Sequence, residues 1–278
     1  MLRDDFLNWF CCPVCGGALI KNEKNAVCDN GHSFDFAKKG YINLLMSQQS
    51  SDKRHGDDKL MVRSRQGFLD GGFYKPLAET VAEMLKAELK HGLPVCDIGC
   101  GEGYYTQYLK SAVPSSPVFG IDISKNALIY AAKRCPGLDF AVASAFSLPF
   151  CSSFAGALVN IFAPCAYPEF ARVLKDDGVL IKAVPLSEHL FELKAALYDK
   201  PYKNKPELCD DVLFEKVSEK ELKYTFKLSS QQQIYELFTM TPYFYKTSRK
   251  DAEKLLSLES LEATAHFAVE VYKKRIGE

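Results

Sequence analysis

The sequence contains no apolar run of about 18 residues, the length that a membrane-spanning helix needs. Its first ten residues, MLRDDFLNWF, carry acids where a secretory signal has a positive start and then an apolar stretch. An excess of charge is also missing, because 35 Lys and Arg residues balance 35 Asp and Glu residues. These absences predict a cytoplasmic protein without a membrane anchor, and they argue against nucleic-acid binding by bulk positive charge.

Low-complexity tracts are absent too, so disorder is not expected. The 278 residues, 47% of them hydrophobic, suffice for one large α/β domain with a small appended module. Cysteine, in contrast, is well represented, with ten residues. In a reducing compartment these cysteines are expected to be thiols or metal ligands rather than disulfides.

A zinc site is predicted near the N-terminus. Cys12 and Cys15 form a C-x2-C pair, and Cys28 and His32 follow as C-x3-H. Each pair sits among turn-forming residues, and residues 18–28 between them have the pattern of a β-hairpin. Two such knuckles give one Zn²⁺ four protein ligands, so the ion would be structural and would leave no open position for chemistry.

Two other interpretations of these cysteines exist. A redox C-x-x-C pair normally opens a helix after a strand, but Gly16 and Gly17 would break a helix here. Cys11 is a spare thiol that could replace Cys12 as a ligand, although the resulting C-x3-C spacing is less usual.

Beyond the cysteines, residues 47–59 are polar and are expected to form a flexible linker. We therefore predict a zinc-binding domain at 1–46, a linker and cofactor-covering segment at 47–75, and a catalytic domain at 76–278. That last region begins with an amphipathic helix from residue 76, which has proline in its first turn.

Strands and helices then alternate, which predicts a mostly parallel sheet with helices on both faces. Strands are expected at 94–99, 117–122, 138–143, 157–162 and 179–184, and helices at 104–112, 125–135 and 168–175. The pattern weakens beyond residue 197, where we expect a loop at 198–211, a strand at 222–229 and a final edge strand at 265–275.

A glycine-rich loop follows the first of these strands. Gly99, Gly101 and Gly103 are spaced G-x-G-x-G after Asp97, and Asp122 stands at the tip of the next strand. The glycines allow a sharp turn and close approach of a ligand, and the second acid is placed to accept both ribose hydroxyl groups. A plain glycine turn with an N-capping aspartate is the alternative. The arrangement resembles motif I of the class I S-adenosylmethionine-dependent methyltransferases, which have a Rossmann-like, seven-stranded sheet.

Such enzymes hold adenine on the loop after the third strand, usually starting with an acid. Ser144 and Ala145 stand at this place, so a serine hydroxyl or a backbone amide would have to serve, with Phe146 beside the ring.

Taken together, several segments resemble the RlmA-type large-subunit rRNA (guanine-N1)-methyltransferases. They are the zinc knuckles, FDFAKKGYINLL, RQGFLDGGFYKPL, DIGCGEGYYT, FGIDIS, FAPC and EHLFELK. The resemblance implies methyl transfer from S-adenosylmethionine to guanine N1 in a 23S rRNA hairpin, a zinc module that helps to bind this RNA, and a homodimer.

The same resemblance implies that Tyr74, Tyr105, Thr106 and His189 contact the cofactor. From the residues alone, Tyr74 could equally be a packing aromatic and His189 a surface residue of a helix. The C-terminal third matches the family least.

The sequence identifies no catalytic base, although guanine N1 carries a proton that must leave. Candidates lie near the end of the fourth strand of the catalytic domain: Asn160, Phe162, which could stack on a splayed-out base, and Cys165. A Pro-Cys pair there also fits a rival enzyme, an RNA cytosine-C5 methyltransferase with Cys165 as nucleophile. A second rival is a zinc RNA-binding adaptor with a vestigial fold.

With zero net charge, RNA affinity would have to come from local basic patches. Lys38-Lys39, Lys53-Arg54-His55 and Arg63/Arg65 are candidates, and each could instead be an ordinary solvated face.

Overall fold

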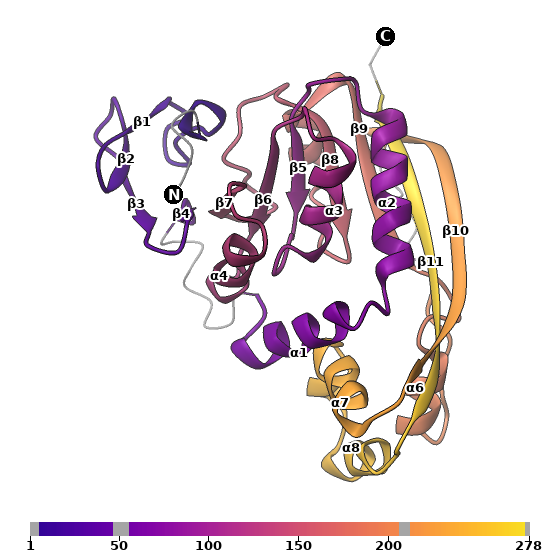
Figure 1. Ribbon diagram of the computed structural model, residues 1–278. Helices are drawn as coiled ribbons and strands as arrows, with labels where there is room; N and C mark the ends of the chain where they lie inside the picture. The colour runs from indigo at the N-terminus through magenta and orange to yellow at the C-terminus, as the bar shows by residue number, and fades with distance from the viewer. Residues whose placement is uncertain (1–5, 47–55, 206–211, 276–278) are drawn as a thin grey trace.

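The computed structural model describes residues 6–46, 56–205 and 212–275. Its strands join into one sheet, with the N-terminal module at one edge and two long strands at the other (Figure 1). The strands are β1 (Leu19–Lys21), β2 (Asn25–Cys28), β3 (Ser33–Ala37), β4 (Tyr41–Asn43), β5 (Val95–Ile98), β6 (Val118–Asp122), β7 (Asp139–Val142), β8 (Ala155–Ile161), β9 (Leu174–Pro185), β10 (Phe214–Leu228) and β11 (Leu261–Lys274). The helices are η1 (Phe6–Trp9), α1 (Lys59–Asp70), α2 (Lys75–Glu88), α3 (Tyr104–Ala112), α4 (Lys125–Arg134), α5 (Tyr167–Val173), α6 (Phe191–Leu197), α7 (Gln231–Met240), η3 (Phe244–Lys246) and α8 (Arg249–Leu256).

Seven of the strands form the α/β core, in the order β7-β6-β5-β8-β9-β11-β10. The pairs from β7 to β9 are parallel, and β11 is antiparallel to both of its neighbours. The expected strands and helices between residues 76 and 184 are confirmed. Residues of α2 and α3 share one core cluster with Ala157, Val159 and Ile161 of β8, whereas residues of α5 and η1 belong to a second cluster with Leu158.

The expectation of an edge strand at 265–275 is wrong, because β11 lies between β9 and β10. Residues 263–272 of β11 are all buried, as a strand covered on both faces requires, while β10 is mostly exposed. The true edge, β10, carries Lys216, Lys220, Lys223 and Lys227, and such charges keep an unpaired strand edge from pairing with other chains.

The N-terminal module, which the sequence predicts as a separate zinc-binding domain, continues the sheet through its own strands. β3 pairs with β4, and β4 runs parallel to β7, with Ile42 opposite Ala141. Aromatic packing adds to the attachment: the ring of Phe10 stacks on Phe150, with centroids 4.9 Å apart. The zinc hairpin is therefore held in a set orientation to the core. The expected flexible segment at 47–55 lies outside the described residues.

Part of the predicted linker is helical. Asp58 caps α1 by accepting hydrogen bonds from the backbone N–H groups of Leu60 and Met61. Helix α1 crosses beneath the sheet and packs on α7, a helix that the sequence did not predict (Figure 1). Together these two helices lie at the carboxyl ends of the parallel strands. The exact domain boundaries remain a prediction.

Cys11 is not a spare thiol, and the expectation that no cysteine forms a disulfide is wrong for this residue. It is bonded to Cys151, which follows β7 in the chain, and their Cα atoms are 6.0 Å apart. The backbone N–H of Cys11 also donates to the carbonyl of Pro149, 2.9 Å away. Sequence reasoning could not find this pair because 140 positions separate the two cysteines. None of the helices in the described part of the chain is long and apolar enough to span a membrane.

Candidate active site and metal centre

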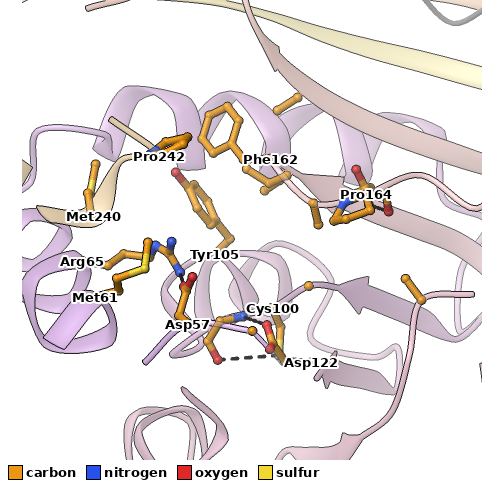
Figure 2. Close-up of a pocket in the computed structure, with 18 of the residues that line it drawn as sticks. Asp57, Met61, Arg65, Cys100, Tyr105, Asp122, Phe162, Pro164, Met240 and Pro242 are labelled. Carbon is orange, nitrogen blue, oxygen red and sulfur yellow. Dashed lines mark hydrogen bonds and ion pairs between the residues drawn. The ribbon is translucent and has the colours of Figure 1, made fainter. Parts of the chain in front are cut away.

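A cavity of about 790 Å³ lies between the carboxyl ends of the parallel strands and helices α1 and α7. Most of the predicted site residues line it: Tyr74, Gly99, Gly101, Tyr105, Asp122, Ser144, Ala145, Asn160, Phe162 and His189. Asp97, Gly103, Thr106 and Cys165 do not line it. Figure 2 shows part of this cavity, with α1 side chains entering from one side and Phe162 from another.

The glycine loop turns between β5 and α3 in a conformation that side chains disfavour. Gly99 has φ +77°, and a Cβ on it would lie 2.4 Å from the Cβ of Ala163. Gly101 has φ +56° and faces the cavity. The backbone can therefore approach a ligand closely here, as the spacing predicts.

Asp122 closes the loop from the neighbouring strand. One oxygen of its carboxylate accepts the N–H of Gly101 at 2.9 Å, and the other accepts the N–H of Ser124 at 2.7 Å. Burial raises the pKa of Asp122, while these two backbone hydrogen bonds lower it. The carboxylate is thus fixed in position and faces the cavity, where ribose hydroxyl groups can donate to it.

Asp97 and Thr106 bond to each other beneath the loop. The Thr106 hydroxyl donates to the Asp97 carboxylate at 2.6 Å, and both side chains are almost fully buried. Burial raises the pKa of Asp97 to about 7, an effect that the Thr106 hydrogen bond opposes and that repulsion from Asp122 adds to. Because the Asp97–Thr106 pair is buried and does not line the cavity, it supports the glycine loop from the protein interior.

Arg65 is a cavity residue that sequence reasoning placed on an RNA-binding surface. It projects from α1 into the cavity, forms an ion pair with Asp57, and its Nη1 lies 3.9 Å from where a Cβ on Gly101 would stand. Burial lowers the pKa of Arg65, but Asp57, Glu102 and other nearby carboxylates raise it by more. Only the fold could reveal this role, because α1 is distant in sequence from the loop that it covers.

Tyr74 and His189 meet at the other end of the cavity, with Tyr74 Oη 3.3 Å from His189 Nε2. The backbone N–H of His266 donates to His189 Nδ1 at 3.5 Å, which assigns the ring proton to Nε2. Burial lowers the pKa of His189 to about 3, so its ring is neutral near pH 7. The hydroxyl of Tyr74 then accepts from His189, and its own proton is left to donate to a ligand.

Phe162 adopts a left-handed backbone, with φ +57°, directly after β8. For a residue other than glycine this costs on the order of 1–3 kcal/mol. The turn presents a ring that is 46% exposed, 5.4 Å from the Phe267 ring and 6.4 Å from Tyr74. Strain of this kind gathers at functional sites, and here it presents an open aromatic surface to the cavity.

Tyr105 brings a second tyrosine hydroxyl to the cavity, in addition to that of Tyr74. Its ring points toward Pro242 and Phe162 in Figure 2, and its hydroxyl is buried without a hydrogen-bond partner among the described residues. Burial raises the pKa of Tyr105 well above its usual value, so the hydroxyl keeps its proton. A buried donor of this kind is satisfied when a polar ligand fills the cavity.

The Cys165 thiol donates to Asn160 Oδ1 at 3.4 Å, and the Asn160 amide donates to the carbonyl of Pro164. Cys165 does not line the cavity, so the geometry does not support its use as a nucleophile. Asn160 orders the loop after β8.

On the side where the sequence predicts adenine, Ser144 and Ala145 form the cavity wall together with Phe146. The Ser144 hydroxyl accepts the N–H of Phe146 at 3.2 Å, and the Phe146 ring is 65% exposed. This ring is therefore available to a flat ligand beside Asp122.

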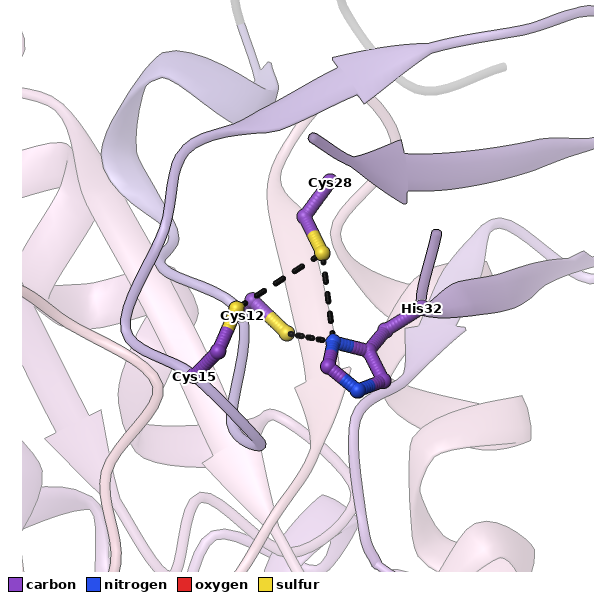
Figure 3. A group of neighbouring side chains, drawn as sticks. All are labelled: Cys12, Cys15, Cys28 and His32. Atoms are coloured by element: carbon purple, nitrogen blue, oxygen red, sulfur yellow. Dashed lines mark hydrogen bonds between the residues drawn. The ribbon is translucent and has the colours of Figure 1, made fainter. Parts of the chain in front are cut away.

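The four predicted zinc ligands come together in the N-terminal module (Figure 3). Cys15 and Cys28 sulfurs are 3.7 Å apart, and His32 Nδ1 lies 3.3 Å from Cys28 Sγ and 3.6 Å from Cys12 Sγ. Zn–S bonds of about 2.3 Å place two sulfurs of a tetrahedron about 3.8 Å apart, so the donor set fits zinc. Hydrogen bonds from the Asn30 side chain and from the backbone of Gly17 lower the pKa of Cys15 to about 6, which favours the thiolate that binds metal.

Comparison with known proteins agrees with both sites. Residues 10–53 match the family described as "RlmA, N-terminal", and residues 95–178 match "Methyltransferase domain". A Bacillus subtilis (strain 168) protein named "Putative 23S rRNA (guanine-N(1)-)-methyltransferase YxjB" is 31% identical over 95% of this chain and 96% of its own length. The chain belongs to the 23S rRNA (guanine-N1)-methyltransferase family.

Another member, the Streptomyces fradiae "23S rRNA (guanine(748)-N(1))-methyltransferase", is 34% identical over 70% of each chain. A solved structure described as a "Putative Type II Methyltransferase", from Anaeromyxobacter dehalogenans, covers 70% of this chain and 95% of its own. Its TM-score is 0.52 at 17% identity, which shows the fold alone.

The expected fold class is thereby confirmed, namely a class I methyltransferase with an N-terminal zinc ribbon. The protein is an S-adenosylmethionine-dependent rRNA methyltransferase that carries a structural zinc site.

Proposed function

We propose that this enzyme transfers the methyl group of S-adenosylmethionine to N1 of a guanine in 23S rRNA. One observation carries the proposal: a single cavity contains both the glycine loop with Asp122 and an aromatic wall that includes Phe162. The first part suits a nucleoside cofactor, and the second suits a base taken out of its stack. The choice of guanine N1 as the methylated atom comes from the names of the relatives.

The cofactor supplies a methyl group that its sulfonium already activates, so the chain mainly binds and aligns the reactants. In our proposal Asp122 accepts the ribose hydroxyls and Phe146 lies beside adenine, next to Ser144 and Ala145. Arg65 is the cation that best suits the cofactor's carboxylate, because guanidinium and carboxylate groups pair with high geometric specificity.

At the other end, Phe162 stacks on the target guanine. The hydroxyls of Tyr74 and Tyr105 keep their protons because burial raises both pKa values. Such donors suit the negative charge that develops on O6 of the guanine as its N1 proton leaves. In the same proposal, Tyr74 and His189 also contact the cofactor. No side chain is assigned as the base.

The test is to incubate the protein with labelled S-adenosylmethionine and undermodified rRNA, and then to map the methylated nucleotide. Methylation at N1 blocks the Watson–Crick edge, so primer extension is expected to stop at one guanine. Label at cytosine C5 without a stop would refute the proposal. Cys165→Ser should retain activity, whereas loss of activity together with loss of a trapped protein–RNA adduct would favour the cytosine-C5 reaction.

The finer features rest on the family resemblance. We propose that the RNA substrate is a hairpin, that the zinc module helps to bind it, and that the enzyme is a cytoplasmic homodimer. Light scattering after size-exclusion chromatography tests the dimer, since a monomer mass at micromolar concentration would refute it. A vestigial adaptor would not bind the cofactor, and calorimetric titration with S-adenosylmethionine tests that alternative.

A further inference from the structure

A second hollow, of about 540 Å³, lies beside the cofactor cavity. Pro185 and Asn204 line both spaces, and Tyr202, Lys203 and Lys205 complete the second one. We call it the Tyr202 hollow. Because the two spaces share these walls, a chain-like substrate with one unit in the cavity can extend directly into the hollow.

Asn204 fixes the hollow relative to the cavity. Its amide nitrogen donates to the carbonyls of Leu186 and His189 at 3.1 and 3.0 Å. Its amide oxygen accepts from the fully buried ammonium group of Lys194 at 2.9 Å. Since His189 lines the main cavity, these hydrogen bonds fix the position of the hollow relative to that cavity.

The hollow presents an aromatic ring to solvent. Tyr202 is 53% exposed, so about half of this residue is open to a ligand. Lys194 Nζ lies 4.9 Å from the centre of the ring, and the ring of Tyr198 is nearly parallel to it, 6.2 Å away. These contacts orient the ring before any ligand arrives.

Positive charge surrounds this ring. Glu188 is shared between Lys203, at 3.0 Å, and Lys223, so one carboxylate faces two ammonium groups. Lys205 adds a further ammonium group at the rim of the hollow. The local balance favours an anionic ligand, although the whole chain has no net charge.

We propose that the Tyr202 hollow binds a nucleotide next to the target guanine, with its base on Tyr202 and its phosphate at Lys203 and Lys205. An oriented aromatic ring with adjacent lysines is the chemistry by which proteins hold unstacked nucleotides of single-stranded RNA. The inference rests on the proposed function, because it requires a guanine in the neighbouring cavity. It assigns part of the RNA contact to the region of the chain that least resembles the family.

The first test combines Tyr202→Ala with rRNA fragments that carry one abasic site within two nucleotides of the methylated guanine. Affinity is measured with S-adenosylhomocysteine present. Loss of one stacked base is expected to weaken binding about 5- to 100-fold. Tyr202→Ala should cause a similar loss of affinity for intact RNA. It should cause little further loss for the RNA whose abasic site removes the base that stacks on Tyr202, because both changes remove the same contact.

Tyr202→Phe is the matched control, since it keeps the ring and should bind RNA like the wild type. Cofactor affinity should be unchanged in both variants, which shows that they are folded. The proposal would be overturned if Tyr202→Ala bound RNA as tightly as Tyr202→Phe. It would also be overturned if the affinity losses from Tyr202→Ala and from the abasic site were additive at every abasic position.

The second test is the salt dependence of RNA binding. Removing the contact with one phosphate lowers the slope of log affinity against log salt by about 0.7 for single-stranded RNA. We expect this for Lys203→Ala/Lys205→Ala, and no change for Lys86→Ala/Lys133→Ala, two exposed lysines on α2 and α4. Equal slopes for the two double variants would contradict the phosphate contacts.

The outcomes separate the two proposals. A wild type that stops primer extension at one guanine, while Tyr202→Ala binds normally, refutes the hollow and leaves the proposed function intact. A wild type that leaves guanine unmethylated refutes both.

Discussion

Nη1 of Arg65 lies 3.9 Å from the point where Gly101 would carry a Cβ, so a guanidinium stands over the face that the glycine leaves open. The two residues come from α1 and from the loop after β5. Helix α1 therefore completes the cofactor cavity as well as covering it.

Arg65→Gln is predicted to weaken binding of S-adenosylhomocysteine by about 10- to 100-fold, the usual value of a charged hydrogen bond. Binding of 5′-methylthioadenosine, which lacks the amino-acid part, should be nearly unchanged. Calorimetric titration of both ligands measures the difference. Arg63→Gln is the matched control, because Arg63 is exposed on the same helix. Equal losses for the two ligands would mean that Arg65 does not face the carboxylate.

Gly99→Ala is predicted to lower the free energy of unfolding and to weaken cofactor binding. Its Cβ would lie 2.4 Å from the Cβ of Ala163, and its φ of +77° adds backbone strain. Gly92→Ala separates the two effects, because Gly92 has the same φ and nothing within 4 Å of a Cβ. We expect Gly92→Ala to cost about 1 kcal/mol in urea unfolding, and Gly99→Ala about 2 kcal/mol more. Similar costs for both would exclude the steric conflict.

Phe162→Ala is predicted to raise KM for RNA and to lower kcat, since stacking of the guanine is lost and the base is no longer aligned with the methyl group. The expected fall in kcat/KM is at least tenfold. Phe162→Tyr keeps the ring and should retain most of the activity. S-adenosylmethionine affinity should stay within twofold for both variants, and a large loss of that affinity would place Phe162 at the cofactor instead.

Cys28→Ser is predicted to abolish zinc binding, which removal of one of four ligands generally does in a structural site. Metal analysis should find one zinc per chain in the wild type and none in this variant. Because β3 and β4 join the zinc hairpin to β7, the variant should also melt at a lower temperature. Cys165→Ser, which removes a thiol outside the cluster, should keep its zinc. Full zinc content in Cys28→Ser would refute the ligand set.

Asp97→Asn is predicted to be less sensitive to pH than the wild type. The folded-state pKa of Asp97 is raised to about 7, so between about pH 4 and pH 7 the folded protein binds a proton that the unfolded chain releases. The contribution of Asp97 to the free energy of unfolding is therefore fully present below pH 4. It is lost as the pH rises through 7, and the loss is at most about 4 kcal/mol. Urea unfolding at pH 5 and pH 8 without cofactor should show a smaller decrease for Asp97→Asn. An unchanged decrease would mean that Asp97 is ionised in the folded protein throughout this range.

Much of the site could be predicted from the sequence because its signals are local. The zinc ligands occupy two short knuckles, and the glycines at 99, 101 and 103 lie within one turn. Asp122 follows the next strand, and parallel neighbouring strands place their carboxyl ends at one edge. The alternation of strands and helices similarly determined the core from β5 to β9.

Only the tertiary structure decided the contacts between distant segments. Strand β11 enters between β9 and β10, β4 pairs with β7, and Cys11 meets Cys151. The sequence does carry one hint of this order, since residues 263–272 are mostly apolar whereas β10 is rich in lysine.

Arg65 and Tyr202 show the same division at the level of function. Each is an ordinary polar or aromatic residue by sequence, and each owes its proposed role to the cavity or hollow that it lines. Local patterns set which elements form, because helix and strand periods depend on neighbouring residues. Packing of those elements across the whole chain decides which side chains line the cavity and the hollow.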